Sequence, residues 1–352
     1  AFSSRRRHTR CSRWSRGLGD VYKRQVDGSV RWQDQLEVVA NVILDNFDLT
    51  AIVETWPAGF PVSGTINVVA NDATVTVTDS MLSITGTDAK AFVDAIVNRE
   101  SAAVEGQLRW ESLRWPLPAD EARVESEKGD IRVSGSIDEW QVDGLIAVGT
   151  EEMPDGTFVV DVAGTRESVT GRIIEGRVFG GNAAGEVTYS WSGEQPWSAS
   201  LNILNIDLGS IFPELPGRVS GRIDGHGAIQ PFALHAELDN IDGSIQGVEL
   251  QANGAVDVVD GIFEARGVRI EHGESWLMLD GSPTTETGLA FAAHVADANS
   301  YVEDIVGEVH AKGHARITDT QAAFDLSLQS PEFIVRGSTF ANVSVVAEGT
   351  HE

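Results

Sequence analysis

The sequence has almost no cysteine, since Cys11 is the only one among 352 residues. That excludes a disulfide framework and a metal site built from several thiolates. Long apolar runs are also missing, and none approaches the roughly 18–20 residues that cross a bilayer. Aromatic residues make up only 7% of the chain, so a thick core of large rings is not expected. We expect a soluble piece whose membrane contacts come from termini outside it.

Basic residues are scarce beyond residue 25. Residues 1–25 hold eight of the 26 Lys and Arg residues and show no apolar period, so they resemble a translated sequencing adapter. We treat them as a non-native or disordered segment. Residues 26–352 carry 18 basic and 52 acidic residues, a formal charge of −34. This charge repels phosphate, so we expect no nucleic-acid partner.

Motifs for catalysis or cofactor binding are also lacking. There is no phosphate-binding glycine loop and no nucleophile elbow, so we assign no catalytic residue, no cofactor and no enzymatic activity. His310 and His314 would lie roughly 13 Å apart on one face of a strand, too far for a shared metal. The Asp-Gly residues Asp155, Asp242 and Asp260 lack the dense carboxylate spacing of calcium loops and are interpreted as turn residues. No metal site is predicted.

The chain does contain many short stretches in which apolar and polar residues alternate. Examples are residues 248–253 (VELQAN) and 324–329 (FDLSLQ), a pattern typical of strands with one apolar face. Turn signals such as DNIDG at 239–243 and VVDG at 258–261 separate them. The pattern predicts an all-β fold with little helix, in which an elongated antiparallel meander coils into an open half-pipe with an apolar groove. Residues 88–97 fit either helix or strand.

A long-range repeat is present as well. Residues 43–66 and 203–225 share an Asn-x-Asp-Leu turn, a proline-bounded loop and a Val-Ser-Gly step. We expect a short turn capped by the aspartate in each copy. The module copies lie near 28–66 and 185–223, with a weak third near 295–316, in one continuous repeat-built region over 26–352. The turn residues are Asn46, Asp48, Leu49, Asn205, Asp207 and Leu208.

Two stretches together resemble the C-terminal-type β-region of the TamB family: ESLRWPLP at 111–118 and GDIRVSGSIDEWQVDGLIAVG at 129–149. A third, WSASLNILNIDLGSIFPELPGRVSGRIDGHG at 197–227, resembles the repeating style of the same family even more closely. The resemblance implies a periplasmic protein anchored to the inner membrane, with a coiled sheet called a β-taco that conducts phospholipid between the inner and outer membranes. It also implies the barrel protein TamA as a partner, bound through regions outside this chain.

The apolar strand faces suggest an occupant for such a groove. Phospholipid acyl chains fit small apolar side chains, because each buried CH₂ gains about 0.8 kcal/mol without a fixed contact. Five tryptophans near the module joints are interpreted as rim or packing residues: Trp32, Trp110, Trp115, Trp191 and Trp197. The predicted lining residues are Val248, Leu250, Ala252, Phe324, Leu326 and Leu328.

Two alternatives to lipid conduction remain open. One is a chaperone or scaffold whose exposed sheet edge pairs with strands of outer-membrane proteins during assembly. The other is an extracellular β-solenoid adhesin, which would need short parallel coils instead of hairpins.

Overall fold

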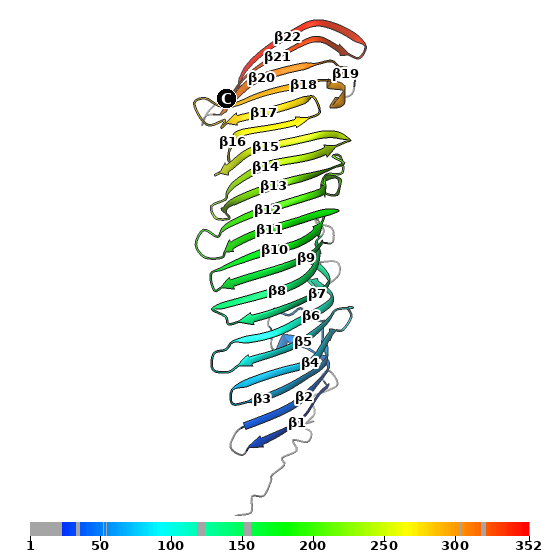
Figure 1. Ribbon diagram of the computed structural model, residues 1–352, viewed down its shortest axis with the longest axis vertical. Helices are drawn as coiled ribbons and strands as arrows, with labels where there is room; N and C mark the ends of the chain where they lie inside the picture. Colours follow the sequence, from blue (N-terminus) through cyan, green and yellow to red (C-terminus); the bar gives the residue numbers. More distant parts are fainter. Residues whose placement is uncertain are drawn as a thin grey trace, which may run out of the picture. The chain divides into compact units, whose positions relative to one another are not determined.

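The computed structural model describes residues 23–32, 36–51, 53, 55–117, 124–150, 156–302, 304–317 and 322–351. The chain divides into two compact units, residues 1–176 and 177–352, and each is described by itself. Both consist almost entirely of antiparallel strands, labelled in Figure 1. The first strand begins at Lys23, so it includes the last three residues of the segment that the sequence assigned as non-native.

Unit 1 is an antiparallel meander. Each strand from β1 to β9 pairs with the next one in sequence, and β9 pairs with β10. Its elements are β1 (Lys23–Trp32), β2 (Leu36–Phe47), the 3₁₀ helix η1 (Leu49–Ala51), β3 (Val62–Asn71), β4 (Thr74–Ile84), β5 (Lys90–Asn98), β6 (Val104–Trp115), β7 (Val124–Gly135), β8 (Glu139–Thr150), β9 (Gly156–Thr165) and most of β10 (Ser168–Val178). Residues 88–97, ambiguous in sequence, therefore contribute a strand.

Unit 2 continues the same design. Strands β11 to β18 pair in sequence order, β20 pairs with β18 and β21, β21 pairs with β22, and the short β19 pairs with β21. Its elements are β11 (Gly181–Ser190), β12 (Pro196–Asp207), η2 (Leu208–Ser210), β13 (Gly217–Ala228), β14 (Ala233–Ile245), β15 (Val248–Val259), β16 (Ile262–His272), β17 (Ser275–Gly281), β18 (Leu289–Val295), η3 (Ala298–Ser300), β19 (Ile305–Val306), β20 (Val309–Ile317), β21 (Ala322–Val335) and β22 (Ser338–His351).

Tight hairpins set the length of several strands. Asp260 and Gly261 both have positive φ, 52° and 77°, as a two-residue type I′ turn requires, so the turn predicted at 258–261 is confirmed. The turn predicted at 239–243 is wrong, because these residues lie inside β14. There Asn240, with φ 49°, belongs to a β-bulge. Asparagine tolerates the left-handed conformation, so the same residue type serves in bulges and in turns.

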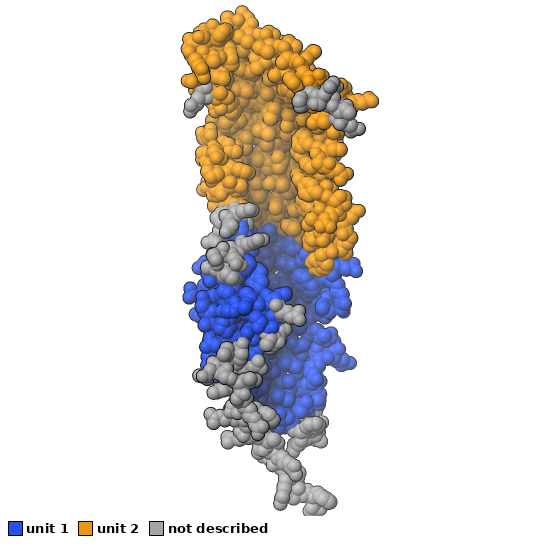
Figure 2. All heavy atoms as spheres, turned by 180° about the vertical axis from the view of Figure 1, so that it is seen from behind, with its two compact units in different colours: residues 1–176 blue, residues 177–352 orange. Residues whose placement is uncertain are grey.

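Bulges recur in neighbouring strands and bend them. In unit 2 the register shifts within the pairs β12–β13, β13–β14, β14–β15, β15–β16 and β16–β17. A bulge kinks its strand and increases the local twist, so a line of bulges curves the sheet. Figure 2 shows unit 2, in orange, hollowed along one face between two walls. The predicted open antiparallel meander with little helix is confirmed, and its antiparallel pairing excludes a parallel solenoid for the described residues.

Candidate functional site

The strand register gives unit 2 an apolar face. Residues paired across an antiparallel ladder point to the same side, and neighbours along a strand point to opposite sides. One row of directly paired residues crosses from β11 to β22, and every member is apolar or glycine. In order, the row is Val187, Ala199, Gly225, Ala236, Val256, Ala265, Gly281, Leu289, Ala315, Phe324 and Gly349.

A second row on this face runs parallel to the first. It joins Ala252, Ile270, Leu277, Ala293, Ala311 and Leu328 through successive cross-strand pairs. Because residues two apart in a strand share a face, the six predicted lining residues all lie on the apolar face. Leu250 is buried, Ala252, Leu326 and Leu328 are half-buried, and Val248 and Phe324 are exposed.

The opposite side of unit 2 is polar. Its cross-strand pairs include Ser198 with His226, Ser200 with Asp224 and His235 with Asp257. We call this side the polar face. This side also carries a few apolar side chains, such as that of Val259, which is 50% exposed.

Unit 1 has the same two faces. A row of Val68, Val77, Ala95, Gly106, Val133, Val142 and Val162 crosses seven strands by direct pairing. The adjacent row contains Glu105, Ser134 and Gln141, which point to the other side. The sequence pattern that builds an apolar face is therefore maintained in both units.

Aromatic rings on this face lie over glycines of the next strand. A Cβ on Gly129 would come within 2.1 Å of the Trp110 ring, and one on Gly349 within 2.3 Å of the Phe324 ring. Trp110 also donates its indole N–H to Ser126 Oγ at 2.7 Å, so its packing is fixed. Trp115 and Trp191 are instead 51% and 42% exposed, and the side chain of Trp32 lies outside the described residues.

The two copies of the repeat turn have the same backbone geometry. Asn46 and Asn205 have φ of 50° and 55°. The backbone N–H of Asn46 donates to Ser63 Oγ at 2.9 Å, and that of Asn205 donates to Ser220 Oγ at 3.0 Å. The serines belong to the Val-Ser-Gly step, so this step and the Asn-x-Asp-Leu turn form one unit in each copy.

The rest of the turn also matches. Phe47 and Ile206, the residues between Asn and Asp, are 4% and 6% exposed. The carboxylate Oδ1 of Asp48 accepts the Thr50 N–H, and that of Asp207 accepts the Gly209 N–H, which caps η1 and η2 at Leu49 and Leu208.

A related cap occurs near the weak third copy. Asp297 Oδ1 accepts the Asn299 N–H at 3.1 Å at the start of η3. The division of the chain into repeat modules itself stays a prediction.

Ion pairs on the polar face fix the charge of two carboxylates. Arg222 donates to Asp224 at 2.9 Å and, with help from Ser200, lowers the pKa of Asp224 to about 2. Burial raises the pKa of Asp257, but contacts with His235 and Arg266 more than offset this, so its pKa is lowered. Arg222 and Asp224 both belong to β13. Ser200, His235 and Arg266 lie on strands next to those of the two aspartates and so join neighbouring strands on the polar face.

The sequence analysis missed one side-chain cluster on the polar face. His294, Glu308 and His310 lie within ligand distance of one another, although His294 belongs to β18, His310 lies at the start of β20 and Glu308 just before it. His310 and His314 are not partners, since His314 contacts Asp325 instead. The cross-strand register that joins His294 to His310 is not visible in the sequence pattern.

These features define a class: all-β proteins built from an antiparallel meander that presents an apolar face in each unit. Among the described residues, no helix is both long and apolar enough to cross a membrane. The chain belongs to the TamB family, since the family described as TamB, N-terminal domain, matches residues 86–348. Membership links it to the translocation and assembly module.

The family match also corrects one expectation. The sequence resemblance pointed to the C-terminal-type β-region, but the matching domain is the N-terminal one. Repeated strands of similar composition look alike along such a protein, which explains the error. Neither the curated proteins nor the solved structures contain a match to this chain.

Proposed function

We propose that this protein conducts phospholipid between the inner and outer membranes, with the acyl chains lying along the apolar face. The observation that carries this proposal is the unbroken row of apolar residues from Val187 to Gly349 in unit 2. Alanine, valine and glycine dominate it. Such small side chains leave space above the sheet for hydrocarbon.

The chemistry of the face suits transport better than tight binding. Each CH₂ removed from water gains about 0.8 kcal/mol, and this gain does not depend on a particular partner atom. A lipid can therefore move from one strand to the next without breaking a directional bond. The aromatic rings support this arrangement, because Trp110 and Phe324 lie over glycines instead of standing across the hollow.

The family supplies the setting of this proposal. We place the protein in the periplasm, anchored at the inner membrane, with TamA as its outer-membrane partner. Its role is non-enzymatic, since the apolar face provides a path and no reacting group. The high negative charge keeps the outer surface soluble and away from anionic headgroups.

Adjacent residues in β21 provide a matched test. Leu326 lies on the apolar face and Ser327 on the polar face, at neighbouring positions of one strand. Native mass spectrometry of the purified protein should detect bound phospholipid. Leu326→Asp should lower the bound fraction several-fold, because a carboxylate desolvated beside acyl chains is costly. Ser327→Asp should leave it unchanged.

Circular dichroism of both variants separates lipid loss from unfolding. Leu328→Asp is a second apolar-face variant, should Leu326→Asp fail to fold. Equal lipid content in the apolar-face and polar-face variants would contradict the proposal. A wild-type protein free of lipid would also contradict it and would favour the strand-pairing chaperone.

A further inference from the structure

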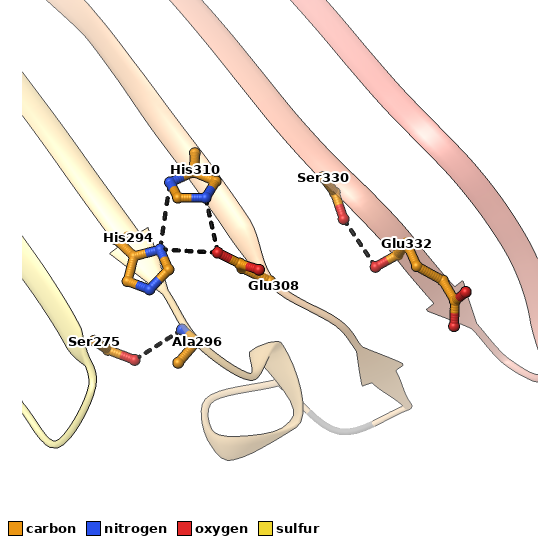
Figure 3. Close-up of polar contacts among 7 residues, drawn as sticks. All are labelled: Ser275, His294, Ala296, Glu308, His310, Ser330 and Glu332. Atoms are coloured by element: carbon orange, nitrogen blue, oxygen red, sulfur yellow. Dashed lines mark hydrogen bonds and ion pairs between the residues drawn. The ribbon is translucent and has the colours of Figure 1, made fainter.

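Two histidines and a glutamate meet on the polar face of unit 2. His294 in β18 and His310 in β20 are directly opposite in register, with their Nδ1 atoms 3.3 Å apart. Glu308 precedes β20, and its Oε1 lies 2.9 Å from His310 Nε2 and 3.7 Å from His294 Nδ1. Figure 3 shows the three side chains turned toward one another.

The donor set suits a zinc ion. Neutral imidazole nitrogen and carboxylate oxygen are common zinc ligands, with bonds of about 2.0–2.2 Å in a tetrahedral arrangement. These bond lengths place two ligand atoms roughly 3.3 Å apart. The two histidine Nδ1 atoms are already at this separation, and one ligand atom from each of the three residues lies within 4.8 Å of the others.

Neighbouring side chains hold His294 in place, whereas His310 and Glu308 stay accessible to solvent. The His294 side chain is 18% exposed, and its ring centroid lies 6.2 Å from that of Trp276. The side chains of His310 and Glu308 are 51% and 44% exposed. An ion can therefore reach the cluster from solvent, and the partly exposed Glu308 can adjust to it.

A second histidine pair on the same face provides a comparison. The rings of His226 and His235 have centroids 4.5 Å apart. There the Arg266 guanidinium lies 2.8 Å from His235 Nδ1 and 2.6 Å from Asp257, so a positive charge already occupies that position. Among the described residues, the ion pairs of Glu308 are with histidines alone.

We propose that His294, Glu308 and His310 form a zinc-binding site, with water completing the coordination. The ion joins β18 to β20 at the base of the connection over residues 296–308. That connection contains η3 and β19, and β19 pairs with β21 instead of with either neighbour in sequence. Zinc therefore fastens the two strands where the chain leaves the regular meander. This site is independent of the proposed lipid path on the opposite face.

Isothermal titration of the full chain with zinc chloride tests the proposal. The wild type should bind one equivalent at this site, and His294→Ala and His310→Ala should weaken that binding at least about tenfold. His226→Ala should bind as the wild type does. Zinc held by Cys11 or by other histidines remains in every variant, so the differences report this site.

Two further measurements keep the test decisive. Cobalt(II) should give the intense visible absorption of a four-coordinate site in the wild type and in His226→Ala, but not in His294→Ala. Glu308→Gln changes an accessible side chain with little risk to folding and should also weaken zinc binding. The assignment would be overturned if the wild type, Glu308→Gln and His310→Ala bound zinc with equal affinity. It would also be overturned if His226→Ala lost as much zinc affinity as His294→Ala.

Discussion

The indole ring of Trp110 in β6 lies over Gly129 in β7, so closely that a Cβ on the glycine would come within 2.1 Å of the ring. The two residues are directly paired in the ladder. Glycine is required here for space, because any side chain would occupy the position of the indole. The same relationship links Trp140 to Gly164. Large rings thus lie along the apolar face without filling the space above it.

Gly129→Val should displace Trp110 and break the hydrogen bond from its indole to Ser126. We expect the free energy of unfolding to fall by about 1–3 kcal/mol, the usual cost of overpacking. Urea unfolding followed by tryptophan fluorescence measures this loss. Ser134→Ala, at an exposed position of the same strand, should change stability by less than about 0.5 kcal/mol. Equal stability of the two variants would show that the ring is not held over Gly129.

The aspartate of the repeat turn should stabilise its 3₁₀ helix. Asp207→Ala removes the acceptor of the Gly209 N–H and should cost about 1 kcal/mol in the free energy of unfolding. Asp207→Asn keeps an oxygen in the capping position and should retain most of the stability. Thermal unfolding of the two variants gives the comparison. An equal loss in Asp207→Asn and Asp207→Ala would mean that charge, and not capping, is the contribution of this residue.

The pKa of Asp224 should depend measurably on the presence of Arg222. The pKa of Asp224 is lowered to about 2 by this arginine, against an unfolded value near 3.9. The stabilisation is therefore complete above pH of about 4 and is lost as the pH falls through about 2. Carboxyl-carbon NMR titration of Arg222→Gln should show the pKa of Asp224 rising toward its ordinary value.

Salt should screen the attraction between Arg222 and Asp224, because both side chains are partly exposed. Raising the salt concentration should bring the pKa of Asp224 closer to its ordinary value in the wild type. Arg132→Gln, a change at an exposed arginine of unit 1, should leave the titration of Asp224 unaltered. An unchanged pKa in Arg222→Gln would exclude the ion pair as its cause.

Strand identity could be predicted from local pattern. Residues 248–253 and 324–329 alternate strictly between apolar and polar, and both lie in strands with their apolar residues on one face. The Asp260–Gly261 hairpin was predictable because few residue pairs adopt positive φ twice in succession. These features depend only on a few adjacent residues.

Which residues face each other across the sheet depends on the register between strands. Short stretches of a single sequence do not reveal this register. The Asp-Gly pair at 242–243 has the composition of a turn but lies inside β14. Asn240 in this stretch has a positive φ, but there it forms a β-bulge and not a turn. Each bulge also shifts which residues face each other. The pairing of His294 with His310 follows from such accumulated register, so no spacing rule within one strand could predict it.

Pairing between sequence neighbours has a consequence for how the protein acquires its structure. Within unit 2, each strand from β11 to β17 forms its ladder with the strand that follows it in the chain. Contacts of this kind close short loops, so their entropic cost is small and does not grow with chain length. A growing chain can therefore add one hairpin at a time to those already formed, before the remainder of the polypeptide has folded.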